Sequence, residues 1–185
     1  MVRRPARCQV RECKKGEENV RTAKIRELTL EEFLPYGAYA NLIDPTSEKL
    51  GSPPIEFFRD MVQQDLGTVG SASFSTCRVE KREMVVNVTE YHTQTAEGIL
   101  PIDNDVLIHV APATPSDGRV PADKIVVFRI PKGTMVVIRP GVWHHAPFTV
   151  NDTPANVLIV LPERTYANDC EVFQLEEDDR IRFEQ

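Results

Sequence analysis

From Ser71 onward the chain alternates between short apolar runs and turn residues. Eight runs are rich in Val, Ile and Phe: Ser71–Val79, Met84–Tyr91, Gly98–Ile102, Asp105–Ala111, Lys124–Ile130, Thr134–Arg139, Val142–Val150 and Ala155–Leu161. Clusters of Asp, Asn, Pro and Gly separate them, and no helical pattern lies between them. Strands this short and closely spaced predict an all-β fold, either a barrel or a double-sheet jelly roll.

The segment before these runs carries one helical pattern. Thr29 followed by Glu32 is a capping box that begins a short stretch with helical spacing, and Pro35 ends it. We therefore expect one short helix laid against the sheet. Residues 44–56 are predicted as loop from their Pro, Gly and Ser content. The acidic stretch from Glu171 predicts either a closing strand or a short helix.

Pro140-Gly141 predicts a turn between two strands, because Pro fixes φ at the first corner and Gly tolerates the second. Successive side chains of the strand that follows point to opposite faces. His144 is therefore expected to share a face with Val142, and Trp143 to share the other face with His145. Only one histidine of the pair can point into a given cavity, and we expect that histidine to be His144.

A second group of polar residues lies at the end of the run before Tyr91. Alternation places the side chains of Glu90 and His92 on one face. Glu97 follows after a short polar link in which the chain can double back into the next strand. Imidazole and carboxylate together suit many divalent metals. We predict a metal site formed by His92, Glu97 and His144, with Glu90 as a further candidate ligand.

Length and charge limit the organisation and the partners of the chain. A chain of 185 residues can form one domain with a sizeable core. We predict a basic tail over residues 1–24 and a single barrel domain over residues 25–185. Residues 1–26 hold nine Lys and Arg against three Glu, whereas residues 27–185 hold 13 basic against 25 acidic side chains. The acidic body argues against nucleic acid as the main partner.

The apolar and cysteine content bears on location. No Cys-x-x-Cys pair occurs among the four cysteines, which favours a reducing compartment. No apolar run approaches the roughly 20 residues of a membrane span, and no apolar signal-peptide segment occurs. We expect a cytoplasmic protein without membrane association. Cys77 is predicted as a small core residue and His109 as a core or cross-strand histidine.

These motifs resemble those of cupins, and specifically those of the ureidoglycolate lyase (ureidoglycolate hydrolase) family. Val142-Trp143-His144-His145 followed by Pro147 is similar to the family's Val-Trp-His-His-Pro signature. Glu90-x-His92 with Pro101 nine residues beyond the histidine is similar to its Glu-Arg-His-Pro…Pro stretch. Phe33-x-x-Tyr36-Gly37 is similar to its N-terminal Phe-x-x-Tyr-Gly. The likeness covers roughly residues 25 to 175.

The chain also departs from the family pattern. Glu97 replaces the usual Gln and restores the His-x4-Glu spacing of metal-binding cupins in general. Ile138-Arg139 stands where the family has Tyr-His, and Pro162-Glu163-Arg164 where it has Gly-Gly. Asn168-Asp169-Cys170 is a permuted form of its Asn-Cys-Asp. These departures favour a metal site and leave the substrate open.

The resemblance implies a cupin-type jelly-roll β-barrel with a short N-terminal helix. It further implies a lyase of allantoin degradation that cleaves ureidoglycolate to glyoxylate and urea with a divalent metal. His92, Glu97 and His144 would hold that ion. The family suggests nickel, and zinc, manganese and iron suit the same ligands.

Five further residues are predicted to serve the reaction. Glu90 or His145 would act as the base, since carboxylate and imidazole are common proton acceptors. Arg78 or Arg139 would hold the substrate carboxylate through a bidentate contact. Trp143 is expected to contact the substrate.

Other functions remain open on the sequence alone. Another small-molecule cupin enzyme, such as a sugar or keto-acid isomerase, decarboxylase or dioxygenase, would use the same ligands. A metabolite-binding barrel would neither turn over substrate nor need a metal. The basic tail is expected either to fray or to dock a partner, and the exposed sheet favours a homodimer.

Overall fold

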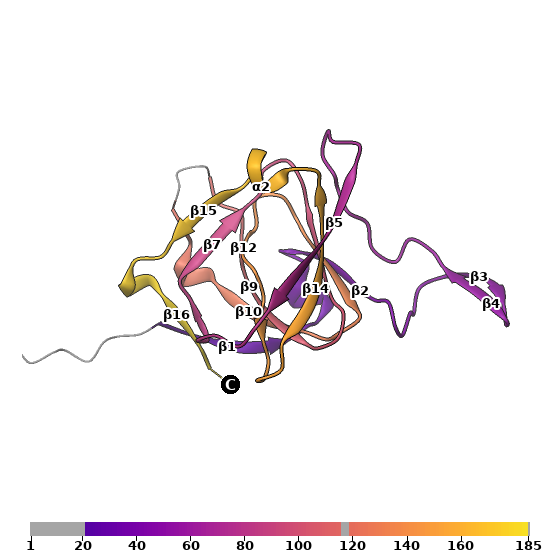
Figure 1. Ribbon diagram of the computed structural model, residues 1–185, viewed down its shortest axis with the longest axis horizontal. Helices are drawn as coiled ribbons and strands as arrows, with labels where there is room; N and C mark the ends of the chain where they lie inside the picture. The colour runs from indigo at the N-terminus through magenta and orange to yellow at the C-terminus, as the bar shows by residue number, and fades with distance from the viewer. Residues whose placement is uncertain (1–20, 116–118, 185) are drawn as a thin grey trace, which may run out of the picture.

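The computed structural model describes residues 21–115 and 119–184, and two curled sheets form its body (Figure 1). The larger sheet has nine strands, of which eight follow one path and β13 pairs with β9. In path order these are β15 (Glu171–Gln174), β7 (Val88–Tyr91), β12 (Trp143–His144), β9 (Val106–Ala111), β10 (Val126–Ile130), β1 (Arg21–Glu27), β16 (Ile181–Glu184) and β6 (Val85–Val86), with β13 (Phe148–Thr149).

The second sheet has five strands and closes the barrel against the first. Its order is β2 (Gly37–Asn41), β11 (Thr134–Ile138), β8 (Glu97–Pro101), β14 (Ala155–Pro162) and β5 (Ala72–Val79). Short helices α1 (Leu30–Phe33) and α2 (Thr165–Asn168), and 3-10 turns at Ala122–Lys124 and Glu177–Asp179, complete the barrel. The predicted all-β jelly-roll barrel is confirmed.

The short N-terminal helix is also confirmed, because the hydroxyl of Thr29 accepts a hydrogen bond from the backbone N–H of Glu32 at 3.3 Å. The predicted tail boundary is wrong where it can be compared. Residues 21–24 belong to β1, which runs parallel to both β10 and β16. Residues 1–20 of the predicted tail lie outside the described residues.

The predicted loop over residues 44–56 overlaps a hairpin of β3 (Lys49–Ser52) and β4 (Ile55–Phe58), so the prediction of a loop is wrong for these residues. Figure 1 shows this hairpin standing away from the barrel at the end of an extended arm. The stretch from Glu171 forms a strand that pairs with β7, one of the two predicted outcomes. Within the described residues, no helix has the length and apolar character needed to cross a membrane.

Two apolar clusters lie on opposite faces of the nine-stranded sheet. Alternation along β9 sends Val106, Ile108 and Val110 between the two sheets, where they pack with side chains of the five-stranded sheet. Leu107 and Ala111 point to the other face, into a second cluster formed by that sheet and the segments folded over it. Whether a residue on these strands faces the barrel interior therefore depends on its place in the alternation of side chains along the strand.

Candidate metal centre

His92 follows β7, and alternation along that strand turns it and Glu90 toward the barrel interior. The imidazole is 3% exposed. Its Nδ1 lies 2.5 Å from the backbone carbonyl oxygen of Asp169, and its Nε2 lies 3.0 Å from Oε2 of Glu97. Both ring nitrogens are therefore held, one by the main chain and one by a carboxylate.

His144 reaches the same point from β12. The Pro140-Gly141 turn before it has the predicted form: Gly141 has a φ of 79°, and the N–H of Val142 bonds to the carbonyl of Arg139. The N–H of Gly141 donates to the backbone carbonyl of His92 at 2.6 Å, which ties the two histidine segments together. His144 is 2% exposed, and its Nδ1 lies 2.8 Å from the Val142 carbonyl.

Glu97 comes from the opposite sheet, at the start of β8. Its Oε2 lies 3.0 Å from Nε2 of His92 and 3.0 Å from Nε2 of His144, and the two imidazole centroids are 5.2 Å apart. Burial alone would raise the pKa of Glu97, but hydrogen bonds and charge from His144 and His92 lower that pKa to about 2. Oε2 of the ionised Glu97 thus links the five-stranded sheet to the two histidines of the nine-stranded sheet.

The pKa of His144 is raised in turn. Burial would lower this pKa, but the hydrogen bond and negative charge of Glu97 and the carbonyl of Val142 outweigh it. The carboxylate and the imidazole therefore stabilise each other's charged form. An apolar replacement of Glu97 would leave two buried imidazoles facing each other without a counter-charge.

The orientation of the two rings fits a divalent ion. Carbonyl oxygens only accept hydrogen bonds, so the Nδ1 atoms facing Asp169 and Val142 both carry hydrogen. Each Nε2 then faces Glu97 with either a second proton or a lone pair. If each Nε2 carries a lone pair, a cation is needed between the rings and the carboxylate, because the facing atoms would otherwise repel. An Nδ1–H bonded to a backbone carbonyl is typical of histidines that bind a metal through Nε2.

The spacing of the donor atoms also fits. His92, Glu97 and His144 offer ligand atoms that all lie within 4.8 Å of one another, and all three side chains are buried. Two ligands roughly 2.0–2.1 Å from an ion and at right angles lie ~2.9 Å apart. The 3.0 Å separations from Glu97 to each histidine are close to that value. The three predicted metal ligands are thus brought together.

A cavity of about 190 Å³ opens beside these ligands. Its lining residues come from both sheets and from the loop and helix after β14: Cys77, Glu90, His92, Glu97, Ala146, Pro147, Ile159, Leu161, Tyr166 and Cys170. Among these described residues none is Lys or Arg. The cavity wall therefore combines apolar side chains with two carboxylates, one imidazole and two thiols.

Residues 20–182 match the model of the family described as Ureidoglycolate lyase. The chain belongs to the ureidoglycolate lyase family. This membership supports lyase activity, and it agrees with the resemblance of the Trp-His-His and Glu-x-His motifs. A comparison with curated proteins found no match.

Solved structures resemble this ureidoglycolate lyase family member only distantly. A dTDP sugar isomerase from Desulfovibrio desulfuricans G20 is 16% identical, with a TM-score of 0.45 over 78% of this chain and 87% of that chain. An oxalate decarboxylase is 18% identical, with a TM-score of 0.39 over 56% of this chain and 24% of that chain. Peruvianin-I from Thevetia peruviana is 13% identical, with a TM-score of 0.41 over 57% of each chain. The chain thus spans about a quarter and about half of the last two, and similarities this distant carry no functional argument.

The two arginines predicted to clamp the substrate lie outside the cavity. Arg78 is exposed on β5, where its Nε lies 3.7 Å from Glu80, and it alternates with the cavity-lining Cys77. Arg139 is exposed at the end of β11, and its Nη1 donates to the backbone carbonyl of Leu34 at 2.6 Å. Neither guanidinium lines the cavity beside His92, so the structure gives no support to either assignment, and both stay predictions.

Trp143 and His145 are also turned away from the cavity. Trp143 is 1% exposed and packs in the cluster on the outer face of the nine-stranded sheet, between Tyr91 and Phe173. His145 follows His144 with the opposite parity, and it does not line the cavity. Burial lowers the pKa of His145, assisted by the charges of Arg82 and His144 and opposed by Glu90. This placement gives no support to a substrate contact by Trp143 or to proton transfer by His145, and both roles stay predictions.

Other predictions for single residues had mixed outcomes. Glu90 lines the cavity, and its role as a base stays a prediction. His109 is a core histidine at 1% exposure, as predicted. Its Nε2 lies 3.1 Å from the hydroxyl of Thr89. Cys77 packs against the inner cluster, as predicted for a core residue. It also lines the cavity, which was not predicted.

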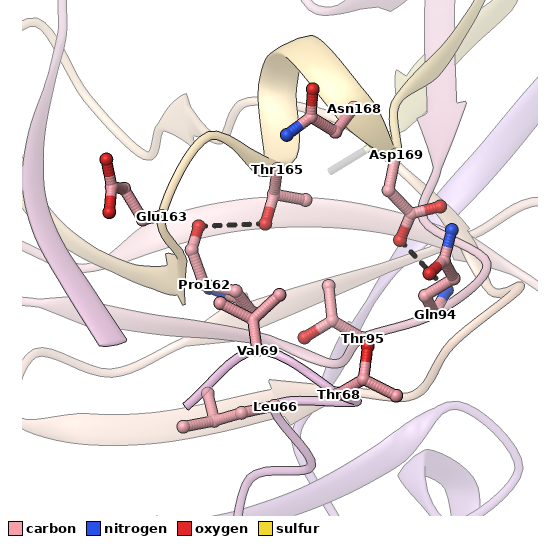
Figure 2. Close-up of a pocket in the computed structure, with 10 residues that line it drawn as sticks. All are labelled: Leu66, Thr68, Val69, Gln94, Thr95, Pro162, Glu163, Thr165, Asn168 and Asp169. Carbon is pink, nitrogen blue, oxygen red and sulfur yellow. Dashed lines mark hydrogen bonds between the residues drawn. The ribbon is translucent and has the colours of Figure 1, made fainter. Parts of the chain in front are cut away.

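Residues near the C-terminus were missed by the sequence analysis. A smaller hollow of about 70 Å³ is lined by Gln94, Thr95, Asn168 and Asp169, among others. Figure 2 shows Asp169 pointing toward Gln94, whose backbone N–H donates to its carboxylate at 2.9 Å. The same carboxylate accepts hydrogen bonds from the N–H and hydroxyl of Thr93, at 2.8 and 2.7 Å. Burial would raise the pKa of Asp169, but these bonds lower it. Asp169 therefore fixes the link that leads from His92 to Glu97.

Cys170 follows directly and lines the cavity itself. Its thiol donates to Oε2 of Glu90 at 3.2 Å. Burial, followed by this bond and the charge of Glu90, raises the pKa of Cys170 to about 12. The permuted Asn168-Asp169-Cys170 motif was the one sequence signal that pointed to this segment.

Proposed function

We propose that this protein is a ureidoglycolate lyase that depends on a divalent metal and cleaves ureidoglycolate to glyoxylate and urea. The observation that carries the proposal is the convergence of His92 and His144 on Glu97, in a chain of this family, next to a cavity that His92 and Glu97 line. The family resemblance favours nickel, and imidazole and carboxylate ligands also accept zinc, manganese or iron.

A divalent ion bound by these side chains would supply a Lewis acid that polarises the carboxylate and hydroxyl oxygens of the substrate and lowers the pKa of the hydroxyl. No Lys or Arg lines the described cavity, so a bound ion would supply positive charge for the substrate carboxylate there. The apolar side chains of Ile159 and Leu161 form part of the cavity wall.

Glu90 is the base in this proposal, because its carboxylate lines the cavity and lies on the same strand face as His92. It removes the proton from the substrate hydroxyl, and the electron pair of that O–H bond forms the aldehyde C=O of glyoxylate. The bond between carbon and the ureido nitrogen breaks, and its electron pair stays on nitrogen. Glu90 then returns the proton to that nitrogen, which gives urea, so no redox partner or second substrate is consumed.

Metal analysis and a glyoxylate-release assay on the purified protein test this proposal. We expect about one divalent ion per chain and glyoxylate release that a chelator abolishes and added metal restores. His144→Ala should remove both metal and activity, whereas its matched neighbour His145→Ala should retain both. Metal-dependent binding without glyoxylate release would instead favour a cupin enzyme for another small molecule. Full activity without metal would refute the proposal.

We further propose a homodimeric assembly and a cytoplasmic location. Exposed apolar side chains support the first: Leu50, Ile55 and Phe57 of the projecting hairpin are each at least 50% exposed. Light scattering that gives about the 20.9 kDa of a single chain would contradict the dimer. Cys77 and Cys170 are free thiols, which fits a reducing compartment.

A further inference from the structure

A second group of potential ligand atoms lies in the same cavity. Glu90, His92 and Cys170 offer a carboxylate oxygen, a ring nitrogen and a sulfur that all lie within 4.8 Å of one another. This group shares His92 with the His92–Glu97–His144 group. The function proposed above makes no use of the sulfur atom.

The position of Cys170 is fixed by the strand that carries the other two residues. On one side, the Asp169 carbonyl holds Nδ1 of His92 at 2.5 Å. On the other side, β15 pairs with β7, and Val172 lies opposite Glu90. The thiol between these two attachments contacts Glu90 at 3.2 Å. The backbone therefore places this sulfur beside His92 in the cavity.

The chemistry of the three atoms differs from that of the first group. A thiolate is a soft ligand that selects ions such as zinc, cobalt(II) and nickel, whereas carboxylate and imidazole also accept manganese. A thiol bound to such an ion loses its proton outright. The S–H bond breaks, its electron pair stays on sulfur, and the proton leaves to water through the open cavity. Glu90 then no longer receives the thiol's hydrogen bond.

We propose that Cys170 is a metal ligand for thiophilic divalent ions at this site, entering through the Glu90–His92–Cys170 group. Since Nδ1 of His92 is engaged by Asp169, its Nε2 is the one nitrogen that both groups can use. The two groups therefore serve one ion. A harder ion such as manganese(II) is held by His92, Glu97 and His144 without the sulfur. This inference rests on the proposed function only in requiring that the site binds a divalent ion.

Cobalt(II) titration of the metal-free protein tests the proposal by absorption spectroscopy. Cys77 lines the same cavity but belongs to neither ligand group, so Cys77→Ser is the matched control for Cys170→Ser. We expect a near-ultraviolet sulfur-to-cobalt charge-transfer band in the wild type and in C77S. C170S should lose this band while keeping the visible cobalt bands. Its affinity for cobalt(II) should fall by about tenfold or more, and its affinity for manganese(II) should stay within about twofold of the wild type.

Several outcomes would overturn the proposal. Cobalt bound by the wild type without the sulfur band would refute the role of Cys170 and leave the proposed lyase untouched. A band that persists in C170S would do the same, as would equal losses of cobalt and manganese affinity. Failure of the wild type to bind any divalent ion would overturn both proposals. A second measurement does not depend on the folding of C170S: zinc should protect Cys170, and not Cys77, from alkylation in the wild type, and equal protection would contradict the assignment.

Discussion

The backbone carbonyl oxygen of Asp169 lies 2.5 Å from Nδ1 of His92, so the segment after α2 orients the ring of a candidate metal ligand that precedes it by 77 residues. The carboxylate of the same residue holds Thr93 and Gln94. One residue thus fixes both the imidazole and the link that carries the chain to Glu97. Residues that orient metal ligands in this way affect the metal affinity without touching the ion.

Asp169→Asn should therefore weaken metal binding. Asn keeps the size of the side chain and the backbone carbonyl, but it removes the charge and one acceptor for the N–H groups of Thr93 and Gln94. We expect the metal affinity to fall by about 10- to 100-fold, as measured by calorimetric titration. Asp103→Asn is the control, because Asp103 makes a similar contact to Asn156 at the far end of β8. Equal losses in the two variants would contradict a specific role for Asp169.

The metal-free protein should be most stable between about pH 4.5 and pH 6.5. The pKa of Glu97 is lowered from 4.5 to about 2, so its stabilisation is present above pH 4.5 and is lost as the pH falls toward 2. The pKa of His144 is raised from 6.5, so its stabilisation is present below pH 6.5 and is lost as the pH rises through the raised value. Both groups are charged in the window between these values.

Denaturant unfolding of the metal-free protein across this pH range measures the effect. The shift of Glu97 corresponds to about 3 kcal/mol in the free energy of unfolding. Glu97→Gln should flatten the acid side of the profile and lower stability near pH 5.5. If the wild type and this variant have parallel profiles, the Glu97–histidine contacts do not stabilise the folded protein.

Arginine substitutions should have little effect on substrate binding. Arg78 contacts only Glu80 among its described ion-pair partners, and Arg139 bonds to the Leu34 carbonyl. We expect Arg78→Ala and Arg139→Ala to leave the KM for ureidoglycolate within about twofold, because surface ion pairs contribute only ~0–1 kcal/mol and neither side chain lines the cavity. A rise of KM by tenfold or more in either variant would show that the guanidinium reaches the substrate.

The strands that line the core could be predicted from the sequence, because burial requires a recurring pattern of apolar residues along them. The strands from β5 onward carry apolar runs, and Thr29 with Glu32 identified α1. Strand β1 carries no such signal: of its seven residues only Ala23 is buried, and its partners β10 and β16 are distant in sequence. The β3–β4 hairpin is exposed almost throughout, so composition alone favoured a loop there.

The ligand set could be predicted for the same reason, and some of the errors could have been avoided. Alternation alone places His92 and His144 inward, and it also turns Arg78 and His145 outward. The roles given to Arg78 and His145 came from the general chemistry of guanidinium and imidazole groups and did not take the alternation of the strands into account. Cys170 could not be placed from the sequence, because its position depends on the pairing of β15 with β7. That pairing is a tertiary contact with no local pattern.

Trp143 should determine stability and not substrate affinity. Its indole ring packs with centroids 4.6 Å from Tyr91 and 5.0 Å from Phe173, and its Nε1 donates to the hydroxyl of Thr114 at 3.0 Å. Replacing a buried Trp by Ala typically costs about 3–5 kcal/mol, because the lost apolar contacts leave a cavity. We expect Trp143→Ala to lower the free energy of unfolding by this amount in urea denaturation. Trp143→Phe keeps a ring and loses the hydrogen bond, so it should cost less, about 1–2 kcal/mol.

For the folded fraction of either variant, KM should stay close to that of the wild type, since the indole lies on the face of the sheet opposite His144. A large rise in KM with unchanged stability would show that Trp143 contributes to substrate binding.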